Sequence, residues 1–184
     1  MTPHLQIHYS LPYLKVLFDG YGHEPGDLNF DEVIGKTEKW GNNFTEFLRG
    51  YEEKIFEIMP KVTGYDWDEK YHVRIPLYLV YPFPKMPSFS DPLTLKVRED
   101  PIQTLGILLH ELAHINIEEK MESEELQESL MTLVALRIMF LLQLDTQKVR
   151  ALFECIYHKR FDKNLELPSL GFRTVKEYLS QLSN

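Results

Sequence analysis

The sequence predicts an α+β fold in a single domain spanning residues 1–184, because helical and strand patterns occupy separate stretches of the chain. Apolar residues recur with a helical period of about 3.6 residues between positions 31 and 59. Residues 71–81 and 93–98 alternate in part between apolar and polar side chains, as strands do. The expected architecture is a long helix backing a small mixed β-sheet with an edge strand, followed by a run of helices.

The first 30 residues are rich in aromatic residues, proline and glycine, which predicts an N-terminal arm of extended chain and loops. Within this arm we expect a short strand at Tyr13–Phe18. The periodic stretch Asp31–Met59 then predicts one long amphipathic helix, with Pro60 and Gly64 beyond its end.

The strands predicted after this helix flank a proline-rich loop. Tyr71–Tyr81 predicts the first strand, and Pro76 within it indicates an edge position or a bulge. Pro82–Pro92 holds four prolines and is expected to be a loop. Leu93–Arg98 alternates again, with cationic residues such as Lys96 on one face, so we expect an edge strand that turns these cations outward.

Helices are predicted throughout the second half of the chain. Asp100 and Pro101 suit the N-cap and the first position of a helix. The second helix of this half, Ser123 to Gln143, is apolar on all sides over most of its length, which predicts that it is deeply buried. The expected helices run from Pro101 to about Glu119, from Ser123 to Gln143, from the cap Asp145-Thr146 to about Arg160, and for a short stretch after the cap Thr174.

The run with the clearest chemical meaning is His110-Glu111-Leu112-Ala113-His114, in the first of these helices. Two histidines four positions apart lie one turn above each other on one helix face, so both imidazoles can reach one metal ion. The intervening Glu111 projects beside the open coordination position. The alternative, a metal-free helix with this spacing by chance, is disfavoured because a charged Glu111 on an apolar face is costly unless paired or functional.

A zinc site usually needs a third protein ligand, and the sequence after His114 offers glutamates for it. A third histidine six residues after His114, with an intervening glycine, is excluded because those positions hold Lys120 and Ile117. The remaining candidates, all carboxylates of the next helix, are Glu124, Glu125 and Glu128.

Helix geometry favours Glu128 among these candidates. The first helix extends about five residues beyond His114, which is a rise of roughly 8 Å. An antiparallel helix that follows it has to rise by a similar distance before its residues are level with the histidines. Residue 128 is then level with the histidines, and residues 124 and 125 lie about one turn lower. Small or apolar residues at the following helical offsets, such as Ala135, give Glu128 an inward face. Glu124 is the second choice.

Composition narrows the expected partners and setting. The formal net charge is −8 without a concentrated basic run, which argues against binding nucleic acid or an anionic membrane surface. No apolar stretch approaches the roughly 20 residues needed to span a bilayer. The single cysteine, Cys155, is expected to be a small buried side chain. With no signal-peptide pattern either, we expect a cytoplasmic protein, whose oligomeric state the sequence leaves open.

In this motif and in the elements around it, the sequence resembles the zincin metallopeptidases, and among them a small gluzincin of the minigluzincin kind. The likeness is strongest over His110–His114 and extends in architecture from about Asp31 to Leu142. It implies a zincin-like fold with Zn²⁺ held by His110, His114 and Glu128. It also implies a metallopeptidase that hydrolyses peptide or protein substrates through a zinc-activated water, with Glu111 as general base.

The resemblance also suggests how a substrate would be held. The edge strand Leu93–Arg98 would align an extended peptide by backbone pairing. His158 is expected as a catalytic donor to the oxyanion, and Tyr157 is the other candidate; the structural alternatives are a cation at a helix end and a core aromatic. The sequence departs from the family pattern at Asn116, where an apolar residue is usual. It departs again at Thr132, where Asp or Asn often orients a histidine, although a hydroxyl could serve.

Two other functions are compatible with the sequence. The first is a latent or non-catalytic zinc-binding module, whose cleft is blocked by its own chain. The aromatic arm of residues 1–30 could lie along the edge strand as an internal pseudo-substrate. The second is a helical interaction protein in which the motif is fortuitous.

Overall fold

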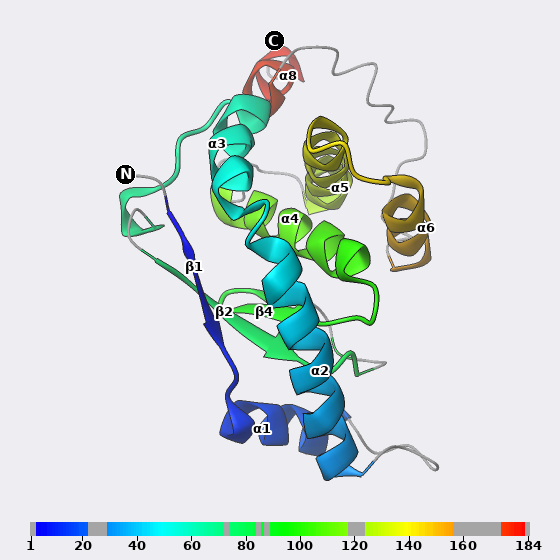
Figure 1. The fold of residues 1–184 in the computed structure, drawn as a ribbon. Coiled ribbons are helices and arrows are strands. Elements are labelled where there is room, and N and C mark those ends of the chain that lie inside the picture. Colours follow the sequence, from blue (N-terminus) through cyan, green and yellow to red (C-terminus); the bar gives the residue numbers. More distant parts are fainter. Residues whose placement is uncertain are drawn as a thin grey trace.

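The computed structural model describes residues 3–21, 29–71, 74–83, 86, 89–117, 124–156 and 174–182. It confirms the α+β class: helix α4 crosses the middle of the molecule, with the sheet and α1 towards one end and α5, α6 and α8 towards the other (Figure 1). The elements are β1 (Leu5–His8), α1 (Leu11–Tyr21), α2 (Phe30–Leu48), α3 (Glu52–Thr63), the 3₁₀ helix η1 (Glu69–Tyr71), β2 (Ile75–Val80), β3 (Phe89–Ser90), β4 (Leu93–Lys96), α4 (Pro101–Ile117), α5 (Glu124–Leu141), α6 (Gln147–Ile156) and α8 (Val175–Leu182).

The sheet is mixed, as predicted, with strand order β1-β2-β4-β3. β1, β2 and β4 are parallel, and the short β3 is antiparallel to β4. The edge or bulge predicted from Pro76 is wrong, because β2 lies between β1 and β4. Tyr78 pairs with Thr94, so Pro76 is level with Pro92, just before β4 begins, and no ladder bond there needs the N–H that proline lacks.

The edge strand predicted at Leu93–Arg98 is also wrong. The chain turns at Asp91-Pro92, so that β3 pairs along the outer side of β4 and becomes the edge itself. The face expected to point outward is covered: Thr94 is fully buried, with its hydroxyl oxygen 3.1 Å from that of Tyr13, and Lys96 is only 9% exposed. The proline-rich loop thus contains a strand of its own.

The N-terminal arm contains regular structure. β1 pairs with β2, and Tyr13–Phe18 lies in α1, so the strand predicted there is wrong. Ser10 Oγ accepts a hydrogen bond from Tyr13 N at the helix start, at 3.3 Å. Leu14 and Leu17, three positions apart, are the buried residues of α1. The two buried leucines thus have the spacing of a helix face, and not that of a strand.

The single helix predicted at Asp31–Met59 is two helices in the structure. α2 ends at Leu48, residues 49–51 form a turn, and α3 follows. Pro60 lies inside α3 rather than beyond it, and the helix ends at Gly64, whose φ of 80° is in the left-handed region that suits glycine. Both helices bury apolar side chains in the same core, so the periodicity continues across the break.

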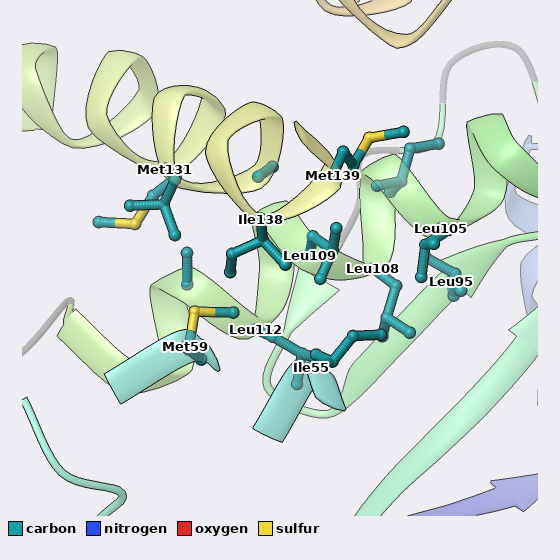
Figure 2. Close-up of a cluster of buried hydrophobic side chains, with 14 of the residues drawn as sticks. Ile55, Met59, Leu95, Leu105, Leu108, Leu109, Leu112, Met131, Ile138 and Met139 are labelled. Carbon is teal, nitrogen blue, oxygen red and sulfur yellow. The ribbon is translucent and has the colours of Figure 1, made fainter. Parts of the chain in front are cut away.

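Helices α4 and α5 confirm, within the described residues, the two helices predicted around the motif. They pack closely on each other, and α4 is buried along nearly its whole length between the sheet and the other helices (Figure 2). The surrounding core has Ile55 and Met59 from α3, Leu95 from β4, Leu105, Leu108, Leu109 and Leu112 from α4, and Met131, Ile138 and Met139 from α5. This packing fixes the polar residues of α4 in place.

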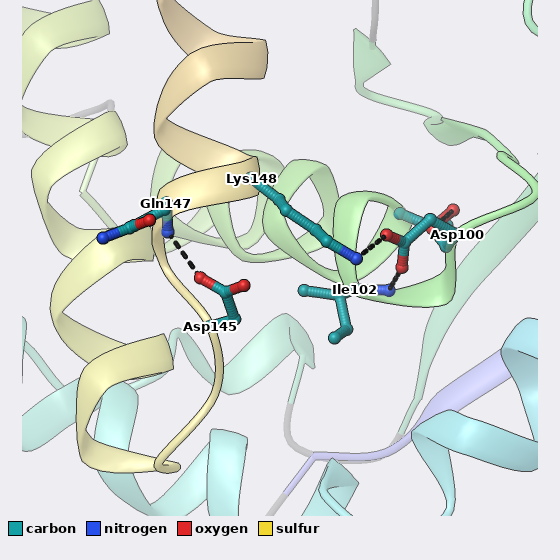
Figure 3. Close-up of polar contacts among 6 residues, drawn as sticks. Asp100, Ile102, Asp145, Gln147 and Lys148 are labelled. Atoms are coloured by element: carbon teal, nitrogen blue, oxygen red, sulfur yellow. Dashed lines mark hydrogen bonds and ion pairs between the residues drawn. The ribbon is translucent and has the colours of Figure 1, made fainter.

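Side-chain caps set the starts of α4 and α6, as predicted (Figure 3). Asp100 Oδ1 accepts a hydrogen bond from Ile102 N at 3.0 Å, and Asp100 Oδ2 is 3.1 Å from Lys148 Nζ. Asp145 Oδ1 accepts one from Gln147 N at 2.9 Å. Since Lys148 belongs to α6, its ion pair also joins the starts of the two helices.

The last helix, α8, begins after its predicted cap. Thr174 Oγ1 accepts a hydrogen bond from Glu177 N at 3.3 Å, and Glu177 Oε2 accepts one from Thr174 N at 3.2 Å. The predicted end of the third helix near Arg160 lies outside the described residues. Among the helices described, none combines the length and apolar character that crossing a membrane requires.

Candidate metal centre

Helix α4 carries three polar residues of the motif at buried positions. His110 is 1% exposed, Glu111 4% and His114 8%. His110 and His114 project from one face because they are four positions apart, and Glu111 is three positions before His114 on an adjoining face. Burying three such side chains on one helix is costly unless they have partners, so their surroundings define the site.

The two imidazoles and a carboxylate of α5 converge. The Nε2 atoms of His110 and His114 are 3.1 Å apart. Glu128 Oε2 lies 3.2 Å from His110 Nε2, and Glu128 Oε1 lies 3.9 Å from His114 Nε2. Among the described residues, these three form the one group of histidine, cysteine and carboxylate side chains that could hold a metal ion. The structure thus brings together the three residues predicted as ligands.

The spacing of these atoms fits a metal ion. Two ligands at about 2.0–2.1 Å from one zinc ion in tetrahedral geometry lie about 3.3 Å from each other. The separation between the two Nε2 atoms and that between His110 Nε2 and Glu128 Oε2 are both close to this value. Two histidines and one carboxylate also form a donor set that zinc uses in catalytic sites.

Thr132 of α5 contacts the ring nitrogen of His110 that does not face the other ligands. Its hydroxyl oxygen lies 3.3 Å from His110 Nδ1. If Nδ1 carries the proton and donates it to Thr132, the lone pair of Nε2 points towards His114 and Glu128, as a ligand requires. The hydroxyl therefore occupies the orienting position that the sequence suggested for it.

Burial keeps the second histidine neutral. The pKa of His114 is lowered to about 4, first by burial and then by the neighbouring His110, while the Glu128 carboxylate acts in the opposite direction. At neutral pH this imidazole is therefore unprotonated, which is the form that binds a metal.

Apolar and polar packing hold α4 at both ends of the motif. Phe153 of α6 is fully buried, with its ring centroid 5.4 Å from that of His110. A side chain on Gly106 would meet Val149 of α6 at 2.4 Å, so glycine permits this close approach of α6. Beyond His114, the amide oxygen of Asn116 accepts a hydrogen bond from the hydroxyl of Thr63 at 2.7 Å, which explains the polar residue at that buried position.

Sequence reasoning missed Lys96 as a residue of this region. Its ammonium is buried, and the pKa is lowered by that burial and by Arg98, while the Glu111 carboxylate raises it. Lys96 Nζ donates a hydrogen bond to the Met86 carbonyl oxygen at 2.7 Å. The only signal in the sequence was the alternation along residues 93–98, which cannot distinguish a covered polar face from a solvated one.

Other predicted site residues lie beyond what the structure describes. His158 and Tyr157 are outside the described residues, and so are the side chains of Glu124, Glu125 and Cys155. The roles assigned to them stay predictions.

Comparisons with protein families, curated proteins and solved structures found no match. The residues of the site and their geometry establish a buried His-His-Glu group that could hold a metal ion.

Proposed function

We propose that the protein is a zinc-dependent metallopeptidase of gluzincin type. The observation that carries this proposal is the convergence of His110, His114 and Glu128 at metal-ligand spacing, with Glu111 next to the first ligand on the same helix. Three protein ligands leave a further coordination position, as catalytic zinc sites do. A purely structural zinc site would more often use four protein ligands.

A zinc ion held there would supply a Lewis acid and make a nearby water molecule more acidic. Glu111 would accept a proton from that water through its carboxylate and later return it to the leaving amine nitrogen. Thr132 would keep His110 in the tautomer that presents Nε2 to the ion. The apolar walls of α4 and Phe153 would exclude bulk water from one side of the site.

The expected substrates are peptide or protein chains. β3 is the sheet edge that contacts α4, so it offers an extended peptide a backbone to pair with near the helix that carries both histidines. The substrate edge that we propose is therefore β3, one strand further out than the edge strand expected from the sequence.

The decisive experiment compares the parent chain with Glu111→Gln and with Glu57→Gln, an exposed carboxylate on α3 that serves as the matched control. We expect about one zinc per chain in all three by elemental analysis, since neither glutamate is a ligand. Peptide hydrolysis, followed by mass spectrometry on a mixed peptide library, should fall by about 10²–10⁴-fold in Glu111→Gln alone. A parent chain that binds no zinc would contradict the proposal, and so would equal hydrolysis by parent and Glu111→Gln.

A latent or non-catalytic zinc module is the second candidate, and the low exposure of His110 and Glu111 favours it. The described residues of the N-terminal arm, 3–21 and 29–30, do not have the place expected for a pseudo-substrate, because β1 pairs with β2 and β3 is the neighbour of β4. Zinc binding without hydrolysis in the parent chain would support this second function over the first.

A further inference from the structure

Lys96 is a buried cation on β4 whose role the metal centre does not explain. Its strand neighbours Leu95 and Val97 are fully buried in the main core, and its paired residue Val80 belongs to the second apolar cluster. An ammonium in such surroundings loses its hydration, and an apolar side chain of similar volume would fill the same space at lower cost. A buried lysine at this position therefore needs a specific partner.

That partner is the chain just before the edge strand. Lys96 Nζ donates its hydrogen bond to the Met86 carbonyl, and the Met86 side chain is 2% exposed in the second apolar cluster. Met86 N also donates to the Phe83 carbonyl at 3.2 Å. Met86 is thus held by its side chain, its amide and its carbonyl, three residues before β3 begins.

The fixed residue precedes the edge strand that contacts α4, the helix of the metal centre. β3 pairs with β4 through only two residue pairs, Phe89 with Thr94 and Ser90 with Leu93. So short a ladder is weak by itself, and anchoring the chain on its N-terminal side would limit its motion. Both β3 and β4 contact α4, where Glu111 lies close enough for its charge to stabilise the Lys96 ammonium.

We propose that Lys96 is a positioning residue, which fixes the edge strand β3 against α4 through the Met86 carbonyl and so sets where an extended peptide lies relative to the metal centre. The part concerning the peptide rests on the proposed peptidase function. The part concerning β3 does not.

The test uses the zinc-loaded full chain and three variants. Lys96→Met removes the donor with little change in volume, Lys96→Arg keeps a charged donor, and Lys54→Met alters an exposed lysine of α3 as the matched control. We expect amide hydrogen exchange across residues 89–97 to accelerate by about tenfold or more in Lys96→Met, and to stay within about twofold of the parent in the other two. Zinc content should be the same in all four proteins.

The kinetic readout separates positioning from general destabilisation. Lys96→Met should raise KM by about fivefold or more for an extended hexapeptide relative to a dipeptide, because only the longer peptide pairs with β3. Loss of the Lys96 charge near Glu111 would affect both peptides alike. Lys96→Arg should restore the parental KM. An equal loss on both peptides would overturn the positioning role.

Parental exchange rates in Lys96→Met would overturn the inference whatever the hydrolysis shows. A zinc-loaded parent that cleaves no peptide would instead contradict the proposed function, and the exchange rates would still decide whether Lys96 fixes β3. If Lys96→Met does not fold, Lys96→Gln serves in its place. Its shorter side chain does not reach the Met86 carbonyl, so the same acceleration is expected.

Discussion

Two buried polar regions of the molecule, the metal centre and the sheet edge (β3 with its neighbour β4), bring their residues together in different ways. In the metal centre, His110 and His114 share one helix, and the contact between Thr132 and His110 spans 22 residues of sequence. At the sheet edge, the contact between Tyr13 and Thr94 spans 81 residues and joins α1 to β4. The first region depends on helix geometry, and the second depends on the order of the strands.

This difference decides which mutations should affect function and which should affect the sheet alone. The metal centre lies on two helices that pack along their length, so a lost ligand has no replacement nearby among the described residues. The sheet edge is tied by single hydrogen bonds between distant segments. We therefore expect large local effects at the centre and small distributed effects at the edge.

Removing one ligand should give the largest effect. Zinc binding of roughly 10–16 kcal/mol, shared among about four ligands, gives about 2.5–4 kcal/mol for each. His110→Ala should therefore weaken zinc binding by about 10²–10³-fold, as measured by competition with a chelator. His4→Ala, at an exposed histidine, is the control and should bind zinc like the parent. Parental affinity in His110→Ala would show that the ion is held elsewhere.

A core truncation tests the helix packing without touching the ligands. Leu109 is fully buried in the cluster of Figure 2, so Leu109→Ala should lower the free energy of unfolding by about 3 kcal/mol. Leu11→Ala, where the leucine is 50% exposed, should cost less than about 0.5 kcal/mol. Urea unfolding of the metal-free chains gives both values. Equal costs would contradict the tight packing of α4.

Acid should destabilise the metal-free chain through His114. Its pKa is about 4 in the folded chain against an ordinary 6.5, so below pH 6.5 the unfolded chain binds the proton more readily. Stability should then fall by up to roughly 3 kcal/mol as the pH drops from 6.5 to 4, and stay level above pH 6.5 for this group. His114→Asn should flatten the profile in that window. An unchanged slope in this variant would assign the effect to other groups.

Loss of the orienting hydroxyl should have a moderate effect. Thr132→Val keeps the shape but removes the partner of His110 Nδ1, so zinc affinity should fall by about 10–100-fold. Thr132→Ser keeps the hydroxyl and should stay near the parent. Competition titration against a chelator measures both, and equal affinities in the two variants would remove Thr132 from the centre.

The smallest effect should come from the distant contact at the sheet edge. Tyr13→Phe removes the hydroxyl next to Thr94 and should cost about 1 kcal/mol of unfolding free energy without changing zinc affinity. Tyr51→Phe is the control, because its hydroxyl has no hydrogen-bond partner among the described residues. A change in zinc affinity in Tyr13→Phe would show that the two regions are coupled.

The residues around the motif were predictable because helix geometry links sequence spacing to position. A rise of 1.5 Å per residue was sufficient to favour Glu128 over Glu124 and Glu125, and Glu128 is the carboxylate that meets the histidines. Asp100, Asp145 and Thr174 marked helix starts through their own side-chain bonds. Each of these inferences needed only neighbouring residues.

The sheet edge was not predictable in the same way. Alternation along residues 93–98 identified a strand but could not show that β3 would pair outside it, since that depends on the turn at Asp91-Pro92. It also could not show that Met86 and Tyr13 would cover the face of Lys96 and Thr94. The break between α2 and α3 was hidden because both helices bury apolar residues in one core.

The opposite edge of the sheet has a consequence for how the chain behaves in concentrated solution. His4 accepts its bond from Ile75, so the next amide, that of Leu5, points away from β2, and it donates to Glu52 Oε1 at 2.7 Å. A strand of four residues with an outward amide already engaged by a helix carboxylate is a poor template for a strand of another molecule. Glu52 thereby protects the exposed margin of β1 against edge-to-edge aggregation.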